Sequence, residues 1–186
     1  MIRLTWAGIL FAMTVMPGIS AAADFQLTSP TIKPKQTIGK AHVFDGFGCT
    51  GDNVSPELRW ANAPKGTKSF AVTVYDPDAP TGSGWWHWVI FNIPSDITAL
   101  AADAGKPNGP GAPQGSVQSM TDFGEPGYGG PCPPPGHKPH RYIFTVYALK
   151  VEQFSLKPAT PAAMVGFYLN QNALAKASFT GLYSRK

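Results

Sequence analysis

Three stretches of the chain show the hydrophobic pattern of buried β-strands. In residues 69–75 the side chains alternate, and Phe70 and Val74 share the apolar side. Residues 88–93 are apolar almost without a break, which is typical of a strand that is covered on both faces. Residues 141–149 are β-branched or aromatic throughout. These segments are predicted to form the centre of a sheet.

Weaker patterns suggest further elements. Three short strands are predicted at Phe25–Thr28, His42–Phe44 and Phe179–Tyr183. One helix is predicted, with Thr160 as its N-cap, Pro161 in the first helical position and an end near Lys176. Its apolar stripe is expected to pack into the core and consists of Met164, Phe167, Tyr168 and Leu174. Residues 101–139 read as a long Pro- and Gly-rich loop. The predicted fold class is mainly β, a pair of antiparallel sheets with one late helix.

The first 23 residues have the three parts of a secretory leader. Arg3 gives a positive start, residues 4–16 are apolar, and the segment ends in small side chains up to Ala23. The apolar run is shorter than the roughly 20 residues of a membrane-spanning helix. We therefore expect cleavage near Ala23, a single domain over residues 24–186 without a transmembrane segment, and a periplasmic or secreted protein.

The composition supports this interpretation. Charged residues make up 14% of the chain, which contains 20 Gly and 19 Pro, and this favours strands and turns over a helical bundle. The net charge of +4 is scattered, so no basic tract predicts nucleic-acid binding. Cys49 and Cys132 lie in Gly-rich loops, and outside the cytoplasm an even number of cysteines favours a disulfide between them.

Two carboxylates follow the first predicted strand. Asp76 and Asp78 belong to the segment Asp-Pro-Asp-Ala-Pro, where proline must end the sheet ladder. An ordinary turn explains the same residues, because Asp and Pro are common turn formers. The sequence alone leaves both interpretations open.

A histidine leads into the second predicted strand. His87 has the parity of Val89 and Phe91, so it is expected to point to their side of the sheet. A histidine in this position is more often a hydrogen-bonded core residue than a ligand. Three tryptophans beside it are most simply explained by packing, with a cation-binding aromatic cage as the alternative; they are Trp85, Trp86 and Trp88.

A stiff Gly- and Pro-rich loop over residues 129–136 leads into the third predicted strand. His140 and Tyr142 project to one side of that strand, and Arg141 projects to the other. His137 lies in the loop without a supporting pattern and is interpreted as solvated.

Together these segments resemble the phosphatidylethanolamine-binding, or Raf-kinase-inhibitor-like, protein family. The resemblance rests on the Asp-Pro-Asp-Ala-Pro turn, the histidine before an apolar strand and the Gly-Pro-Pro-rich loop that ends in His-Arg-Tyr. Residues 51–60 and 81–88 are also similar to the family. The likeness covers nearly the whole mature chain and is greatest to the bacterial exported branch, which carries Phe-Gly-Cys near its front and a second Cys in the Gly/Pro loop.

The resemblance implies a Greek-key antiparallel β sandwich with a short C-terminal helix and a small cavity for phosphate, acetate or a phosphorylated head group. Matched by motif, the ligand-binding residues would be Asp76, His87, His140 and Tyr142, with Asp78 as a brace and Pro131 at the rim. Cys132 departs from cytosolic relatives. It would pin the rim to the Cys49 loop, so the rim contacts of those relatives do not carry over.

The chemistry of these residue types favours anion binding. A protonated imidazole donates to an anion, and a neighbouring carboxylate raises its protonated fraction. We therefore expect an Asp–His–anion relay and stronger anion binding below about pH 7.

The favoured function is a non-catalytic binding protein that needs no cofactor and that modulates another protein if it has a protein target. One alternative is a hydrolase in which His87 and Asp76 act as base and orienter for water, since Ser83 does not lie in the setting of a nucleophile elbow. Another is an inhibitor of an extracellular enzyme. A third is a metal site built from Asp76, Asp78, His87 and His140, which are usable ligand types.

Overall fold

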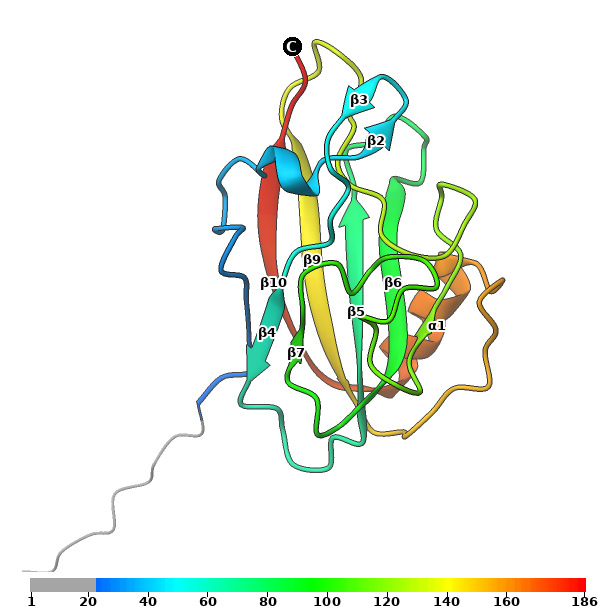
Figure 1. The fold of residues 1–186 in the computed structure, drawn as a ribbon. Helices are drawn as coiled ribbons and strands as arrows, with labels where there is room; N and C mark the ends of the chain where they lie inside the picture. The colour runs from blue at the N-terminus through cyan, green and yellow to red at the C-terminus, as the bar shows by residue number, and fades with distance from the viewer. Residues whose placement is uncertain (1–22) are drawn as a thin grey trace, which may run out of the picture.

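Two antiparallel sheets packed face to face form the framework of the structure, a computed structural model that describes residues 23–186 (Figure 1). The larger sheet has the order β10 (Ala173–Tyr183), β9 (His140–Leu149), β5 (Ser69–Asp76), β6 (Trp85–Pro94) and β8 (Val117–Gln118). The smaller sheet has the order β1 (Gln26–Thr28), β4 (Leu58–Ala61) and β7 (Ala99–Leu100). The remaining elements are the 3-10 helix η1 (Lys40–His42), the hairpin of β2 (Asp45–Gly46) and β3 (Cys49–Thr50), and the helix α1 (Ala162–Asn172). The predicted β sandwich with one short helix is confirmed.

The predicted leader, apart from Ala23, lies outside the described residues. Within residues 23–186, no helix has both the length and the hydrophobicity needed to cross a bilayer.

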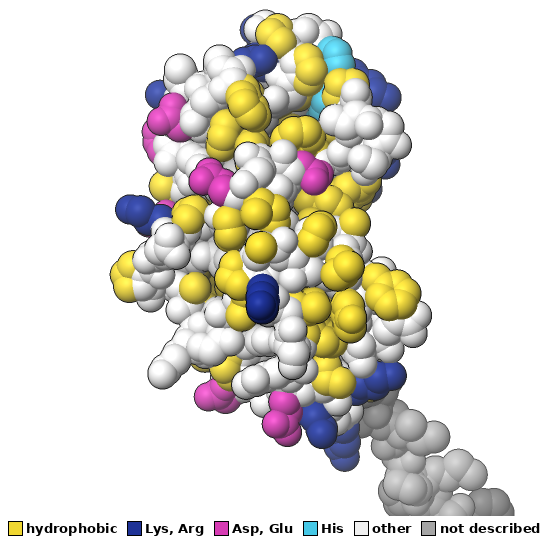
Figure 2. Space-filling view, turned by 90° about the vertical axis from the view of Figure 1, so that its right-hand side faces the viewer, with side chains coloured by type: hydrophobic (Ala, Val, Ile, Leu, Met, Phe, Trp, Pro, Cys, Tyr) yellow, Lys and Arg dark blue, Asp and Glu magenta, His cyan; other side chains and the backbone are white. Residues whose placement is uncertain are grey.

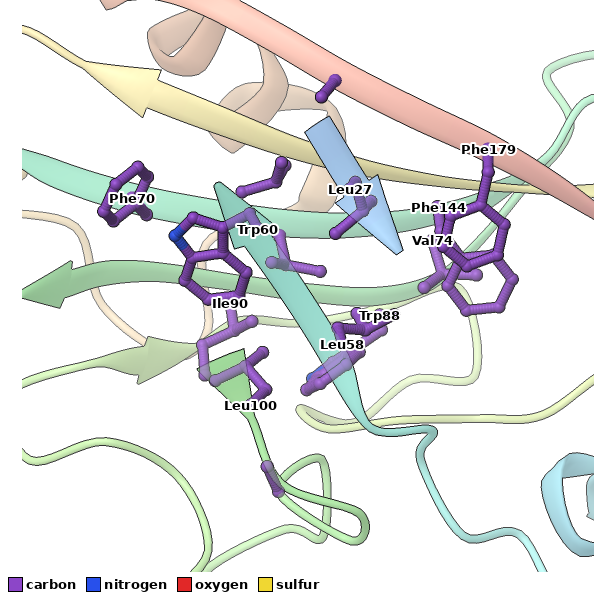
Figure 3. Packing of buried hydrophobic residues seen from close by; sticks show 14 of the residues in the cluster. Leu27, Leu58, Trp60, Phe70, Val74, Trp88, Ile90, Leu100, Phe144 and Phe179 are labelled. Atoms are coloured by element: carbon purple, nitrogen blue, oxygen red, sulfur yellow. The ribbon is translucent and has the colours of Figure 1, made fainter. Parts of the chain in front are cut away.

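The three strongest predicted strands are β5, β6 and β9, and β5 and β9 are central in the larger sheet. Their inner faces pack against the smaller sheet (Figure 3). The largest buried side chains of this core include Trp60, Phe70, Trp88, Ile90, Phe144 and Phe179. Burying each such side chain stabilises the fold by roughly 1.5–3 kcal/mol. This core therefore fixes how the two sheets sit on each other.

The second face of the larger sheet is covered by α1 and the segment before it. Val89 and Phe91 of β6 pack there against Val165 and Leu169 of α1, in a separate apolar cluster. The prediction that β6 is covered on both faces is therefore confirmed.

The helix differs from its prediction in three respects. It begins at Ala162 with Pro161 as the N-cap, one residue later than predicted, and no side chain caps it. It ends at Asn172, because residues from Ala173 onward pair with β9 as strand β10. Strand pairing thus replaces the last predicted helical turn and makes the C-terminal strand much longer than the predicted segment 179–183.

The predicted core stripe of the helix was wrong. Its four members are between 39% and 61% exposed, and they are Met164, Phe167, Tyr168 and Leu174. The buried stripe is instead Ala162, Val165, Gly166 and Leu169, and Gly166 faces the ring of Trp86. Both stripes are apolar at helical spacing, so the periodicity could not choose between them. Hydrophobic side chains are accordingly visible on the face that carries α1 (Figure 2).

The weak strand predicted at His42–Phe44 was also wrong. His42 closes η1, and its two ring nitrogens contact the Val54 carbonyl and the Thr31 hydroxyl at 2.7 and 2.9 Å. Both ring nitrogens of His42 thus have hydrogen-bond partners within the protein, so the residue has a structural role.

Candidate functional site

A pocket of about 180 Å³ lies where β5 ends and where β6 and β9 begin. Because β5 is antiparallel to both neighbours, its C-terminal end meets their N-terminal ends. Four of the predicted site residues line the pocket together, and they are Asp76, His87, His140 and Tyr142. Side chains from three strands therefore meet at one end of the sandwich core.

His87 reaches this pocket through a β-bulge. Val74 pairs with Trp88 and Tyr75 pairs with Trp86, so His87 is the extra residue on β6. A bulge turns a side chain away from strict alternation. The parity prediction for His87 was therefore wrong: the imidazole lies beside Tyr142, with ring centroids 5.1 Å apart, instead of joining Val89 on the opposite face.

Asp76 and His140 form a buried pair at the floor of the pocket. One carboxylate oxygen of Asp76 lies 2.8 Å from His140 Nδ1, and the other accepts a hydrogen bond of 2.7 Å from the backbone N–H of Asp78. Both side chains are almost completely buried. The carboxylate orients the imidazole, so that Nε2 of His140 is the atom left for another partner.

His137 is a site residue that the sequence interpretation missed. Its Nδ1 lies 3.2 Å from His140 Nε2, although the ring itself is exposed. The only sequence clue was the three-residue separation of the two histidines in a stiff loop. A ligand at His140 Nε2 would have to displace or share this contact.

Burial determines the charge of His87. Its Nδ1 donates a 2.7 Å hydrogen bond to the Gly129 carbonyl, and desolvation lowers the pKa of the imidazole to about 4. The ring is therefore neutral near pH 7, with Nε2 as an acceptor. This corrects the expectation that both imidazoles would be protonated donors, because desolvation outweighs the attraction of Asp76.

Tyr142 supplies a polar atom without a partner. Its side chain is 1% exposed, and within residues 23–186 its hydroxyl makes no hydrogen bond. Burial, with a smaller contribution from the negative charge of Asp76, raises the pKa of the phenol, so it keeps its proton and can donate. Buried hydroxyls usually have a partner, and this one lines the pocket.

The other two predicted site residues do not line the pocket. Asp78 accepts two hydrogen bonds from the Arg141 guanidinium and one from its backbone N–H, all at 2.9 Å. These bonds lower the pKa of Asp78 to about 2. Asp78 thus fixes the start of β9, as expected of a brace. Pro131 does not line the pocket, whereas its neighbours Cys132, Pro133 and Pro134 do.

The four-residue metal site considered from the sequence is not assembled. The Asp78 carboxylate already forms an ion pair with the Arg141 guanidinium. Among the described residues, no group of three or more His, Cys, Asp or Glu side chains is arranged to hold a metal ion.

Aromatic side chains that sequence reasoning did not assign to the site form its wall. Phe123 lies 5.5 Å from Trp85 and 5.9 Å from Phe47 between ring centroids, and all three line the pocket. Trp88, by contrast, is fully buried, and its indole N–H donates to Gln118. Of the three tryptophans, Trp85 belongs to the pocket and Trp88 to the core.

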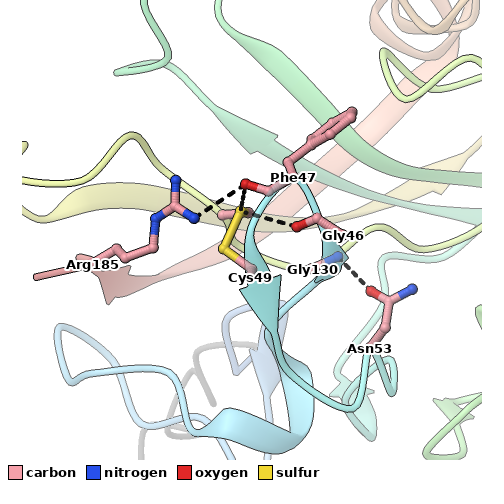
Figure 4. The surroundings of a disulfide bond; sticks show 7 residues. Gly46, Phe47, Cys49, Asn53, Gly130 and Arg185 are labelled. Carbon is pink, nitrogen blue, oxygen red and sulfur yellow. Dashed lines mark hydrogen bonds between the residues drawn. A yellow bond between two sulfur atoms is a disulfide. The ribbon is translucent and has the colours of Figure 1, made fainter.

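The predicted disulfide between Cys49 and Cys132 is present (Figure 4). It joins the β2–β3 hairpin to the Pro-rich loop, and Cys132 lines the pocket. The Gly130 N–H of the same loop also donates a 2.8 Å hydrogen bond to the side chain of Asn53, which follows the hairpin. One wall of the pocket is therefore covalently tied to the hairpin.

Comparisons with known proteins agree with this architecture. The family model for phosphatidylethanolamine-binding protein matches residues 28–184. The chain is 54% identical over 165 residues to the UPF0098 protein YbcL of Escherichia coli K12, covering 89% of this chain and 90% of that protein. It is 48% identical over 164 residues to YbhB of the same organism, covering 86% and 99% of the two chains.

Solved structures show the same relationship. The crystal structure of E. coli YbcL, described as a member of the mammalian PEBP family, superposes with a TM-score of 0.87 at 54% identity and covers 88% of this chain and all of that one. The homologue CT736 from Chlamydia trachomatis superposes with a TM-score of 0.72 at 30% identity, covering 89% of this chain and all of that one. The chain therefore belongs to the phosphatidylethanolamine-binding protein family.

Proposed function

We propose that this chain is a binding protein that holds a small anionic group, such as a phosphate, at the floor of the pocket without turning it over. The observation that carries the proposal is the buried Tyr142 hydroxyl, which has a proton to donate, lies near the Asp76 carboxylate, and makes no hydrogen bond of normal geometry among the described residues. Leaving a buried donor unpaired costs about 1–3 kcal/mol. An oxyanion in the pocket would remove that penalty.

The neighbouring groups supply the rest of a phosphate site. Protonated His140 would donate from Nε2 to the anion and from Nδ1 to Asp76, which balances the positive charge and keeps the carboxylate from facing the ligand. Neutral His87 would accept from a phosphate oxygen that carries a proton. The proposed relay therefore runs from Asp76 through His140 to the anion.

The test is calorimetric titration with inorganic phosphate at pH 6. His140→Asn keeps a donor near Asp76 but removes Nε2, so phosphate should bind at least about tenfold more weakly, as expected for a lost hydrogen bond to a charged group. Lys150→Ala is a matched control, because it removes an exposed cation just beyond the far end of the same strand. Wild-type affinity in His140→Asn would contradict the proposal.

The same preparations test the hydrolase alternative. The sequence suggested His87 as the partner of Asp76, but in the structure Asp76 contacts His140. A water-activating Asp76–His140 pair would release p-nitrophenol steadily from p-nitrophenyl phosphate or p-nitrophenyl acetate, and His140→Asn would abolish the release. We expect no such turnover. Steady release that depends on His140 would instead show that the protein is a hydrolase.

We further propose that the protein acts outside the cytoplasm. The proposal is supported by the leader-like residues 1–23 and by the disulfide, which persists in oxidising compartments. Expression of the full chain in E. coli should yield a periplasmic product whose N-terminus is near Asp24. An uncleaved product in the cytoplasmic fraction would contradict this.

A further inference from the structure

The tip of the β2–β3 hairpin carries an aromatic residue in an unusual place. Phe47 and Gly48 both have positive φ, 50° and 78°, which is the pattern of a two-residue type I′ turn. Asn, Asp and Gly are the usual residues there, because a bulky side chain is disfavoured in the left-handed region. Phe47 is also 69% exposed, so burial in the core does not compensate. Turn geometry and burial in the core do not account for this phenylalanine, whose ring lies 5.4 Å from that of Phe44 and 5.9 Å from that of Phe123 between centroids.

The hairpin tip is held in position from several sides. The disulfide ties Cys49, two residues after Phe47, to the loop that lines the pocket. The Arg185 guanidinium donates a 3.1 Å hydrogen bond to the Phe47 carbonyl (Figure 4), and the N–H of Phe44 donates to the Pro131 carbonyl at 3.2 Å. The exposed ring of Phe47 is therefore presented at the pocket by a fixed backbone.

The rings beside Phe47 form a slot above the polar floor. Phe47 and Phe123 are nearly parallel, with an interplanar angle of 14°, and Trp85 meets Phe123 edge-on at 83°. Aromatic rings favour such offset and edge-to-face arrangements. The flat ring of a ligand could therefore pack against these three rings in the same way. The cationic side chain of Arg185 next to this tip disfavours a ligand cation in the slot.

The size of the pocket limits what can enter. Its volume of about 180 Å³ is close to the roughly 150 Å³ of an apolar cavity that holds one benzene molecule. The pocket can therefore take a small anionic group and part of a single ring, with the rest of the ring against the rim. A second large group would remain outside.

We propose that Phe47 and Phe123 make the pocket selective for small anions that carry one flat aromatic ring. The anionic group lies at the Tyr142 hydroxyl and His140, and the ring lies against Phe47. This inference rests on the proposed function, because the polar floor must first bind the anionic group. Phe47 is the specificity-determining residue, and the disulfide keeps it pre-positioned.

The experiment compares two probes with the same charged group. Phenylphosphonate carries a ring and methylphosphonate does not, and neither is readily hydrolysed. By titration calorimetry, phenylphosphonate should bind the wild-type protein about tenfold more tightly, a ratio that corresponds to about 1.4 kcal/mol. Phe47→Ala should reduce the ratio to below about threefold, because it removes the ring against which the phenyl group packs.

Two further variants sharpen the test. Phe167→Ala removes a similarly exposed ring from α1, outside the pocket, and should keep the wild-type ratio. The double variant Cys49→Ser/Cys132→Ser should lower the ratio, because an untethered Phe47 must be ordered on binding. Cyclohexylphosphonate tests ring shape, and affinity equal to that of phenylphosphonate would contradict the requirement for a flat ring.

The outcomes separate the two proposals. If both probes bind equally, or if Phe47→Ala keeps the wild-type ratio, the proposed selectivity for an aromatic ring is wrong, but the proposed anion site is not contradicted. If neither probe binds, the proposed function fails and the inference fails with it. If only phenylphosphonate binds measurably, loss of its binding in Phe47→Ala supports the slot and unchanged binding overturns it.

Discussion

Replacing Tyr142 by phenylalanine should change binding and stability in opposite directions. The substitution removes only the hydroxyl, which is buried at the floor of the pocket and has no hydrogen-bond partner among residues 23–186. A hydrogen bond to a charged ligand contributes about 1.5–3 kcal/mol, so phosphate should bind roughly 10- to 100-fold more weakly. The ligand-free protein should be equally stable or more stable, by up to about 1–3 kcal/mol, because an unpaired buried polar group is gone.

Tyr128 provides the matched control. It is also buried, but its hydroxyl donates a 2.8 Å hydrogen bond to the His42 carbonyl. Tyr128→Phe should therefore lower the free energy of unfolding by about 1–2 kcal/mol and leave phosphate affinity unchanged. The measurements are urea unfolding without ligand and calorimetric titration with phosphate. If Tyr142→Phe destabilises the protein as Tyr128→Phe does, or keeps wild-type affinity, the hydroxyl is not a ligand donor.

Three further predictions concern the framework of the site. Cys49→Ser/Cys132→Ser should lose about 4 kcal/mol of unfolding free energy, because the disulfide closes a separation of 83 residues; urea unfolding checks this, and an unchanged midpoint would contradict it. Since the pKa of His87 falls from 6.5 to about 4 on folding, the unfolded state binds more protons between these values. Stability should therefore drop by about 3 kcal/mol as the pH falls from 7 to 4, and His87→Gln should flatten this acid limb. Gly84→Ala should be destabilising, because Gly84 has φ +72° and an added Cβ would collide with the Tyr75 side chain and the Asp76 carbonyl; thermal unfolding should show a lower midpoint, and a wild-type midpoint would contradict the steric argument.

Much of the architecture could be predicted from local pattern. The apolar runs of β5, β6 and β9 could be buried only at the centre of a sheet, and their ends placed Asp76, His140 and Tyr142 beside one another. Proline after Asp76 ended the strand there. Residue types and spacing were sufficient at these positions, because the hydrophobic pattern of a strand and the proline that ends it depend only on a residue and its immediate neighbours.

Other features depended on tertiary contacts. His87 reaches the pocket only through a bulge, and a bulge is defined by the partner strand, not by the strand that contains it. The helix buries Val165 and Leu169 instead of Phe167 because the choice between two apolar stripes depends on the surface beneath. Burial, which no sequence pattern measures, makes His87 neutral.

By itself the sequence determined the β sandwich, the pairing of two cysteines and the types of side chain at the pocket floor, because hydrophobic period, turn chemistry and residue type are local properties. Only the tertiary structure decided that burial keeps His87 neutral, which hydroxyl lacks a hydrogen-bond partner among the described residues, and that Phe47 and Phe123 face the pocket together. Desolvation, hydrogen-bond satisfaction and ring contacts arise between segments that are far apart in the chain, and they exist only once those segments have packed.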